Sequence, residues 1–445
     1  MASPAAMATY ASGSKRLREP TKSVGELDMA DFKRHKVSDA TNESHEQVAP
    51  VMNAIEFLSR RLSHPGIDKV QGMIYALAIG DSLGLPIEFA RTIPKLEYTP
   101  TLNEVDFSIQ FRWHAVQVKA FSCSDDSEMS LTMLRSLVRN KMRYNVDDVI
   151  QSYLNWANQS SMLGKNTRKL MKGVKLVSGY RKRVAKMEVE ERSKSQSNGT
   201  LMRASPLALL KEFDVKAIEQ DVHISNPNPV NLYCDLVYVA LLRILLQGGS
   251  VTDCSDFCKA LVSDEKAVAA LYPQQQMRTL PPEVSLSITD SFDSTIVRDI
   301  THPAKGWVCN SLYIALKAFW NYRSFQSAME FIIKDHPHSD TDTNACIAGA
   351  LFGAHLGFDA LAQESNTKIN ISKINAYWAG CPISLKNYTL DHALLLKLKE
   401  HFEPAAQTTT TPDPHSVTLF ESEAAVPQRA CATAAAANAA SAADE

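Results

Sequence analysis

The sequence predicts a mostly helical protein whose ordered part forms one large domain. Apolar residues recur at helical spacing along several segments, and one long segment is apolar on nearly all sides. Alternation of apolar and polar residues is confined to two short stretches. No internal repeat or long linker divides the middle of the 445-residue chain. These observations favour helices around a common core, with one small hairpin.

The first elements follow from two different periodicities. HAVQVKAFS (residues 114–122) alternates with period two, which predicts a strand or an extended loop. Next, Leu131, Leu134 and Val138 recur at spacings of three and four. This stripe predicts an amphipathic helix over residues 127–140, with its apolar side on the core.

The later elements are helical with one exception. Residues 231–249 are apolar nearly all round and end in two glycines, which predicts a buried central helix with a glycine stop. EVSLSITDSF (residues 283–292) alternates with period two and is expected to be a strand or an extended loop. Residues 307–320 and 324–335 return to the helical pattern, and residues 340–357 predict a helix of small residues.

Composition narrows the class of protein. With 45% hydrophobic and 22% charged residues, the chain has enough apolar side chains for a sizeable core. A formal net charge of -2 gives no sign of specific nucleic-acid binding. The longest strongly apolar run, residues 236–246, is interrupted by Arg243 and is shorter than the ~20 residues of a membrane span. We therefore expect neither a membrane nor a nucleic-acid partner.

Low-complexity composition marks two tails. Residues 1–46 are polar and basic, and residues 404–445 are rich in Thr, Pro and Ala, so we expect both to be disordered around a domain at 47–403. Residues 15–18 and 33–36 are basic clusters, either a nuclear-localisation signal or charges of a solvated tail. The chain's start lacks the apolar core of a secretory signal. We expect an intracellular protein, cytoplasmic or nuclear or both.

The cysteines support this expectation. None of their spacings makes a zinc site, and several lie within apolar helical patterns. We expect buried reduced thiols at Cys123, Cys234, Cys254, Cys258, Cys309, Cys346, Cys381 and Cys431.

Acidic and hydroxyl residues open the helix of small residues. Asp340, Thr341, Asp342 and Thr343 precede an alanine- and glycine-rich run. Such side chains can cap a helix, because their oxygens accept hydrogen bonds from the N–H groups of the first turn. They can also bind a metal ion, and a slender helix would let its neighbours bring further ligands close.

A second acidic cluster lies about 214 residues earlier. Ser124, Asp125 and Asp126 precede the amphipathic helix, and Glu128, three residues after Asp125, predicts a capping box. One cap residue suffices for a helix, so the surplus carboxylates would repel each other unless a cation lay among them. Carboxylate and hydroxyl oxygens suit Mg²⁺, Mn²⁺ or Ca²⁺ rather than Zn²⁺.

Two further segments carry weaker signals. Residues 72–90 contain three glycines without the spacing of a dinucleotide site, and their only acids are Asp81 and Glu88. Asn198 and Gly199 lie in a polar loop, which is either an ordinary turn or a phosphate-binding loop.

In order along the chain, these segments resemble the motifs of the ADP-ribosylglycohydrolase family. The motifs are GMIYALAIGDSLGLPIEF, SDDSEMSL, SNGTLMRASPLAL, VHISNPNPVNLYCDLVYVALLRILL and DTDTNACIAGALFGAHLG, and the resemblance spans roughly residues 68–365. It implies a compact all-α, single-domain fold with a binuclear Mg²⁺ centre, in which Mn²⁺ is an alternative. The implied activity is hydrolysis of the glycosidic bond that links ADP-ribose to a protein side chain or to a small molecule.

The resemblance also implies roles for individual residues. The metal ligands would be Ser124, Asp125, Asp126, Asp340, Asp342 and Thr343. The residues that bind ADP-ribose would be Ser195, Gln196, Ser197, Asn198, Gly199 and His223. Cleavage passes through an oxocarbenium-like transition state and needs proton transfer, for which Glu88, Asp125 and Asp342 are the candidates.

One departure from the family pattern leaves an alternative. His338 and Ser339 stand where many members have two glycines, and we expect their side chains to narrow the ribose pocket or shift the metal loop. The alternative is an inactive relative that binds ADP-ribose or a protein partner, but the retained acids favour an enzyme. The sequence does not indicate whether arginine, serine or another group carries the ADP-ribose.

Overall fold

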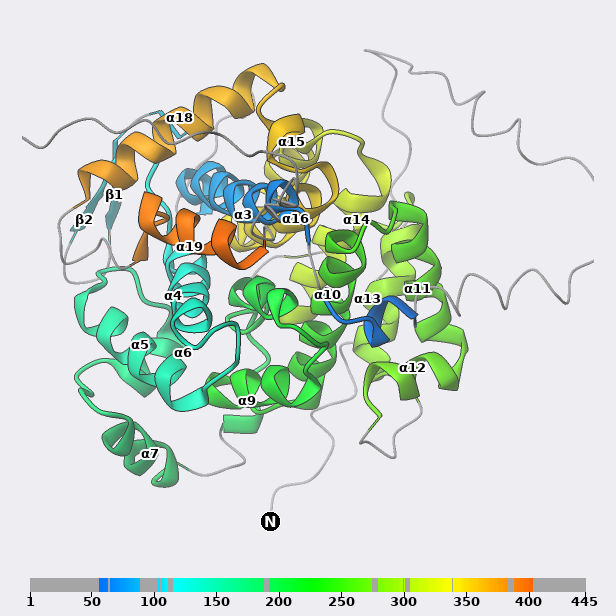
Figure 1. Cartoon of the computed structure of the whole chain (residues 1–445), viewed down its shortest axis with the longest axis horizontal. Coiled ribbons are helices and arrows are strands. Elements are labelled where there is room, and N and C mark those ends of the chain that lie inside the picture. The colour runs from blue at the N-terminus through cyan, green and yellow to red at the C-terminus, as the bar shows by residue number, and fades with distance from the viewer. Residues whose placement is uncertain are drawn as a thin grey trace, which may run out of the picture. The chain divides into compact units, whose positions relative to one another are not determined.

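Two long helices, α3 (Ile67–Glu88) and α16 (Thr341–Leu356), lie side by side at the centre of the protein, and the other helices surround them (Figure 1). The computed structural model describes residues 56–62, 65–88, 103–104, 106–110, 115–187, 192–273, 279–298, 300, 305–337, 339–381 and 388–402. The predicted tails lie outside this part of the chain, and the domain limits and localisation stay predictions.

The remaining elements follow in chain order. They are β1 (Phe107–Gln110), β2 (Ala115–Val118), α4 (Asp125–Arg139), α5 (Val146–Gln159), α6 (Lys165–Met171), α7 (Val177–Ala185), η2 (Leu201–Arg203), η3 (Ser205–Leu209), α9 (Val215–Ser225), α10 (Pro229–Leu246), α11 (Val251–Ser263), α12 (Glu265–Leu271), α13 (Pro282–Phe292), α14 (Val308–Asn321), α15 (Phe325–Asp335), α17 (Phe358–Leu361), α18 (Ser365–Gly380) and α19 (His392–Phe402).

Small residues allow α3 and α16 to pack backbone against backbone. A methyl group at Gly80 would lie 2.2 Å from the carbonyl oxygen of Ala345, and one at Gly349 would lie 2.3 Å from that of Ala76. Any side chain at these glycines would therefore force the helices apart. The predicted role of the small residues in close helix packing is confirmed.

Most predicted helices are present. Residues 127–140 lie largely in α4, and residues 307–320 and 324–335 correspond to α14 and α15. The helix α10 is buried, and Gly248 follows it with a positive φ of 91° that favours glycine. The stretch 114–122 contains β2, which pairs antiparallel with β1 and completes the predicted hairpin.

The prediction for residues 283–292 is wrong, because this stretch forms the helix α13. Its buried residues, Val284, Ser287, Ile288 and Ser291, follow helical spacing, whereas Leu286 is 55% exposed. Two of the four core-facing residues are serines, so hydrophobicity alone hid the helical period. The mostly helical fold class is confirmed.

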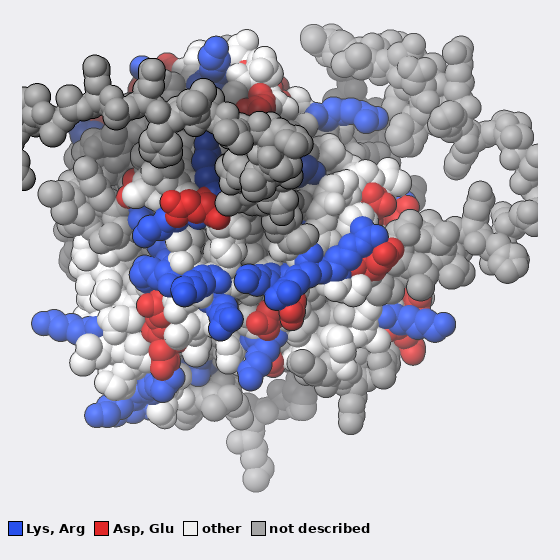
Figure 2. All heavy atoms as spheres, viewed as in Figure 1, with Lys and Arg blue, Asp and Glu red and all other residues white. Residues whose placement is uncertain are grey.

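The helices α3 and α10 are long and apolar enough to span a membrane, but 89% and 94% of their most apolar windows are buried inside the protein. Such burial is typical of helices in the core of a folded domain. The seven cysteines among the described residues are buried and free, as predicted, and Cys431 lies outside those residues. Lys and Arg side chains form an interrupted band across the face shown in Figure 2, with Asp and Glu beside it.

Candidate active site

Carboxylates from α3, α4 and α16 meet at one point in the protein. Carboxylate oxygens of Asp81, Asp126 and Asp342 lie within 4.8 Å of one another, and so do those of Glu88, Asp340 and Asp342. Asp342 belongs to both groups. The structure therefore brings together the two acidic clusters that are far apart in the sequence.

The N-terminus of α4 is capped by residues other than the predicted box. Ser124 is the N-cap, and its Oγ accepts a hydrogen bond from the Asp126 N–H at 3.2 Å. From α3, the Asp81 carboxylate accepts from the N–H groups of Ser124 at 3.0 Å and Ser127 at 3.1 Å. Because these groups satisfy the helix end, the carboxylates of α4 are not needed for capping.

The acids of the predicted capping box have other partners. Glu128 accepts hydrogen bonds from Trp156 Nε1 at 2.6 Å and Ser160 Oγ at 3.0 Å, so the predicted box is wrong. Asp125 accepts from the Gly164 N–H at 3.0 Å. A signal four residues long could not anticipate these contacts, since α5 and the loop after it supply the donors.

At the N-terminus of α16, the capping interpretation also fails for the first acid. Asp340 occupies the N-cap position, but its side chain makes no capping hydrogen bond. Asp342 Oδ1 accepts from the N–H of Thr343 at 2.9 Å. Both carboxylates thus face the cluster rather than serving only as caps.

Burial and mutual repulsion disfavour charge in this cluster. Burial raises the pKa of Asp126 and Asp342 well above the usual range, and neighbouring carboxylates raise it further. Burial followed by the charge of Asp340 raises the pKa of Glu88 to about 8, and burial raises that of Asp125 to about 6. Asp126 Oδ1 is also buried without a hydrogen-bond partner. A bound cation would relieve both the repulsion and the unpartnered oxygen, so the site fits a metal ion with oxygen ligands.

A polar loop, residues 195–199, lies beside the cluster. The Asn198 N–H donates to the Gly306 carbonyl at 3.0 Å, and Gln196 Oε1 accepts from Trp307 Nε1 at 2.8 Å. These contacts pair the loop with the segment that leads into α14.

The 195–199 loop contacts the carboxylate cluster directly. Asn198 Nδ2 donates to Asp340 Oδ2 at 3.1 Å and to Ser311 Oγ at 3.0 Å. A methyl group at Gly306 would lie 3.1 Å from the same Asp340 oxygen, so this residue also borders the site. The predicted loop and the predicted metal ligands therefore share one site.

His223 is placed differently from the other predicted residues. It lies near the end of α9 and is exposed, and its backbone carbonyl accepts a hydrogen bond from Arg192 Nη2 at 2.8 Å. Within the described part of the chain, no recorded contact joins its imidazole to the carboxylate cluster. Its role in substrate binding stays a prediction.

Three residues of the site were not predicted as functional from the sequence. Asp81 lies seven residues before Glu88 in α3, a spacing that places both on one helix face and could have revealed it. Lys305 Nζ donates to the Glu88 carbonyl at 3.1 Å and lies 3.4 Å from its Oε1. Neither Lys305 nor Gly306 carries a local signal, because tertiary packing alone brings that loop to the site.

Ser339 does not project into the site. It is buried, its Oγ donates to the carbonyl of His336 at 2.6 Å, and it accepts from Asn344 Nδ2 at 2.9 Å. These bonds direct its hydroxyl to residues before and after it in the chain. His338 lies outside the described residues, so its expected effect on the ribose pocket or the metal loop stays a prediction.

Comparisons with known proteins identify the family of this chain. The family model described as ADP-ribosylglycohydrolase matches residues 63–377. A protein of Acanthamoeba polyphaga mimivirus named as an ADP-ribosyl glycohydrolase is 25% identical over 303 residues, covering 64% of this chain and 86% of the relative. A solved structure titled "ADP-ribosylglycohydrolase-related protein complex" has a TM-score of 0.50 and 20% identity, covering 76% of this chain and 98% of its own, and supports the fold. The chain therefore belongs to the ADP-ribosylglycohydrolase family and is an enzyme that acts on glycosidic bonds.

Proposed function

We propose that the enzyme uses Mg²⁺ to hydrolyse the glycosidic bond between ADP-ribose and a protein side chain or a small molecule. The observation that carries this proposal is that two clusters of three acidic residues lie side by side and have Asp342 in common. Buried carboxylates at this spacing are costly unless a cation neutralises them, and oxygen ligands favour Mg²⁺ or Mn²⁺. Of the proposed ligands, Asp126 is in one group and Glu88 and Asp340 are in the other, with Asp342 in both, which supports two ions rather than one.

Residues at the C-terminal end of α3 and at the N-terminal ends of α4 and α16 would hold the metal. The proposed ligands are those implied by the family motifs, Ser124, Asp125, Asp126, Asp340, Asp342 and Thr343, with Glu88 added by its position in the second carboxylate group. Bound Mg²⁺ would supply a Lewis acid and a template for ribose hydroxyls and the attacking water. Asp81 would hold the ligand-bearing end of α4, because its carboxylate accepts that helix's N–H groups.

The protein's own groups would orient the substrate and move protons. We assign ADP-ribose binding to the 195–199 loop, which contacts Asp340 through Asn198, and to His223. Glu88 and Asp125 are partly exposed, whereas Asp342 is only 3% exposed. Glu88 and Asp125 are therefore better placed than Asp342 to exchange a proton with a substrate.

The test presents arginine-linked and serine-linked ADP-ribosyl peptides in parallel, with Mg²⁺ and with EDTA, and measures released ADP-ribose. We expect release from one linkage with Mg²⁺, and none in EDTA or after Asp340→Ala. Glu265→Ala, a substitution of an exposed acid in α12, is the control that keeps activity. Full turnover in EDTA would contradict the metal proposal. Binding of ADP-ribose without release from either peptide would favour a non-catalytic binding protein.

A further inference from the structure

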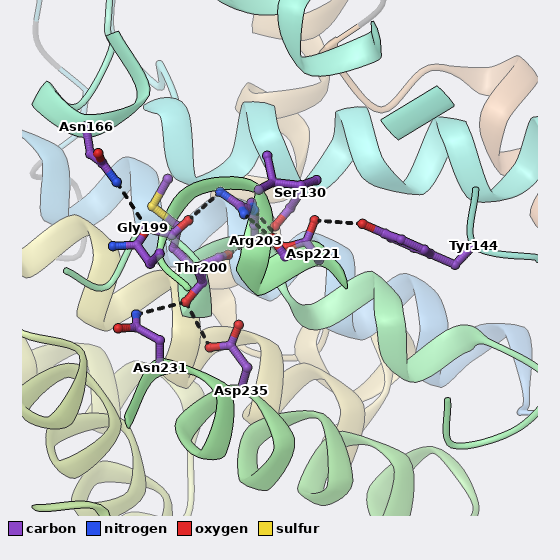
Figure 3. A network of polar contacts seen from close by, with 12 residues as sticks. Ser130, Tyr144, Asn166, Gly199, Thr200, Arg203, Asp221, Asn231 and Asp235 are labelled. Atoms are coloured by element: carbon purple, nitrogen blue, oxygen red, sulfur yellow. Dashed lines mark hydrogen bonds and ion pairs between the residues drawn. The ribbon is translucent and has the colours of Figure 1, made fainter. Parts of the chain in front are cut away.

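A buried arginine donates a hydrogen bond to the last carbonyl of the 195–199 loop (Figure 3). Arg203, in η2, is 1% exposed, and its Nη1 donates to the Gly199 carbonyl at 3.0 Å. Its Nε and Nη2 donate to the Oδ2 and the backbone carbonyl of Asp221, both at 2.9 Å. One guanidinium therefore ties the loop to α9 through three hydrogen bonds.

Other side chains hold Arg203 in turn. Its guanidinium lies 5.2 Å from the ring centre of Tyr153, and Tyr144 donates to Asp221 Oδ1 at 3.3 Å. Burial alone would lower the pKa of Arg203, but the Asp221 carboxylate raises it, so the guanidinium stays charged. A buried ion pair is often no more stabilising than apolar residues of similar size. Stability alone is therefore a weak reason for this arrangement.

Two asparagines hold the other end of the same loop. Asn226 Nδ2 donates to the Ser195 carbonyl at 3.2 Å and to Ser197 Oγ at 3.0 Å. Asn231 Nδ2 donates to the Ser197 carbonyl at 2.8 Å. With Arg203 on Gly199, the carbonyls of Ser195, Ser197 and Gly199 each accept a hydrogen bond from a buried or half-buried side chain.

The orientation of these carbonyls matters for an anionic ligand. A carbonyl oxygen is the negative end of the peptide dipole. A carbonyl that turned toward a diphosphate would repel it, whereas a loop with its carbonyls held inward keeps those negative ends away.

We propose that Arg203 is a positioning residue for the 195–199 loop, which it holds, with Asn226 and Asn231, in the conformation that accepts ADP-ribose. This rests on the proposed function of the loop. Arg203 is buried and acts through its hydrogen bond to Gly199, so it affects ligand affinity without being a metal ligand.

The test compares Arg203→Lys with Arg243→Lys. Lysine keeps the charge but lacks the planar fork that reaches Gly199 and both Asp221 acceptors at once. Arg243 is a matched control, because it is equally buried and donates to backbone carbonyls outside the 195–199 loop, including that of Lys211 at 2.7 Å. The dissociation constant and stoichiometry of free ADP-ribose are measured by calorimetry with Mg²⁺ present, and Mn²⁺ binding is measured separately.

We expect Arg203→Lys to weaken ADP-ribose binding about tenfold at unchanged stoichiometry, the effect of losing roughly one hydrogen bond. Mn²⁺ affinity should stay unchanged, and Arg243→Lys should bind ADP-ribose like the wild type. Misfolding would lower the stoichiometry rather than the affinity. If Arg203→Lys does not fold, Asn226→Ala carries the same expectation.

The outcomes separate this proposal from the function on which it rests. Equal ADP-ribose affinity in the wild type and Arg203→Lys overturns the positioning role and leaves the proposed function standing. The same loss of affinity in Arg243→Lys also overturns it, because the effect would then be general destabilisation. A wild-type enzyme that does not bind ADP-ribose at all overturns both.

Discussion

Asp342 is the residue that the two clusters of carboxylates share. Its pKa is raised by burial and then by Glu88, Asp126 and Asp340. Its ionised form is therefore disfavoured in the protein without metal and favoured once a cation binds. Such residues lower stability for the sake of function.

Asp342→Asn should therefore stabilise the protein without metal while it abolishes metal binding. We expect the melting temperature in EDTA to rise by about 2 to 4 °C, equivalent to roughly 1 kcal/mol, because folding then no longer has to protonate a buried carboxyl group that is ionised in the unfolded chain. The shift in melting temperature on adding Mg²⁺ should disappear.

Differential scanning fluorimetry in EDTA and in Mg²⁺ measures both effects, with Glu265→Gln as the control at an exposed acid. A variant that melts earlier in EDTA, yet keeps the Mg²⁺ shift, would show that Asp342 is a structural acid rather than a ligand.

Asp81 shows how a residue contributes to the site without being a free ligand. Its carboxylate accepts the N–H groups of Ser124 and Ser127, a role that the sequence pattern had assigned to the acids of α4 itself. The local capping box failed because a neighbouring helix provides the acceptor. Asp126 is thereby left with an unpartnered oxygen for a cation.

At the scale of elements, the contact between α3 and α16 determines the position of the acids. Asp81 and Glu88 are at the C-terminal part of α3, and Asp342 is in the first turn of α16. A methyl group at Gly84 would lie 2.5 Å from the Asp342 Cα atom, so the two backbones touch at the site itself. The distance between α3 and α16 therefore sets the distance between the carboxylates that these helices carry.

Gly80→Ala should separate these helices. The added methyl would lie 2.2 Å from a backbone carbonyl oxygen of α16, which cannot move aside as a flexible side chain can. We expect a loss of about 1 to 3 kcal/mol in the free energy of unfolding, typical of overpacking, and a weaker Mg²⁺ shift. Urea denaturation with and without Mg²⁺ measures both.

Gly380→Ala is the matched control, because Gly380 is also a helical glycine but a methyl there meets nothing within 4 Å. It should be neutral or slightly stabilising, since alanine favours helix. Equal losses in the two variants would mean that α3 and α16 do not depend on their close contact.

At the scale of the whole molecule, the carboxylate cluster makes stability depend on pH. The pKa of Glu88 is raised to about 8 and that of Asp125 to about 6, whereas such groups ionise near pH ~4 in an unfolded chain. Between these values the unfolded chain releases protons that the folded protein keeps. The stability contribution of these groups is therefore full below about pH 4 and is lost as the pH rises toward about 8.

Mg²⁺ should stabilise the protein more at about pH 8 than at about pH 5.5, because protons compete with the metal for the same carboxylates. The measurement is the Mg²⁺-induced change in melting temperature at each pH. An equal change at both values would contradict the assignment of the metal to this cluster.

His336 gives the stability of the protein the opposite dependence on pH. Burial and then Lys317 lower the pKa of its imidazole to about 4, so its contribution is present above about pH 6.5 and lost as the pH falls through about 4. This opposite trend occurs with and without metal, so it cancels in the Mg²⁺-induced change.

The sequence by itself determined the mostly helical class, the bounds of several helices, the glycine stop after α10 and the two acidic motifs that meet at the site. These follow from local spacing, since a stripe at three and four residues or a glycine at a helix end involves contacts within a turn or two. The family followed from the order of the motifs. The helix at residues 283–292 was missed because two of its core-facing positions are serines.

Only the tertiary structure decided which oxygens are available and which charges are disfavoured. Asp81 caps α4 from α3, Lys305 and Gly306 border the site from a distant loop, and Arg203 donates to the last carbonyl of the 195–199 loop. These relations depend on helices and loops that are far apart in the chain and meet only when the common core packs. The raised pKa values follow from the burial that this packing creates, and no local pattern of residues encodes it.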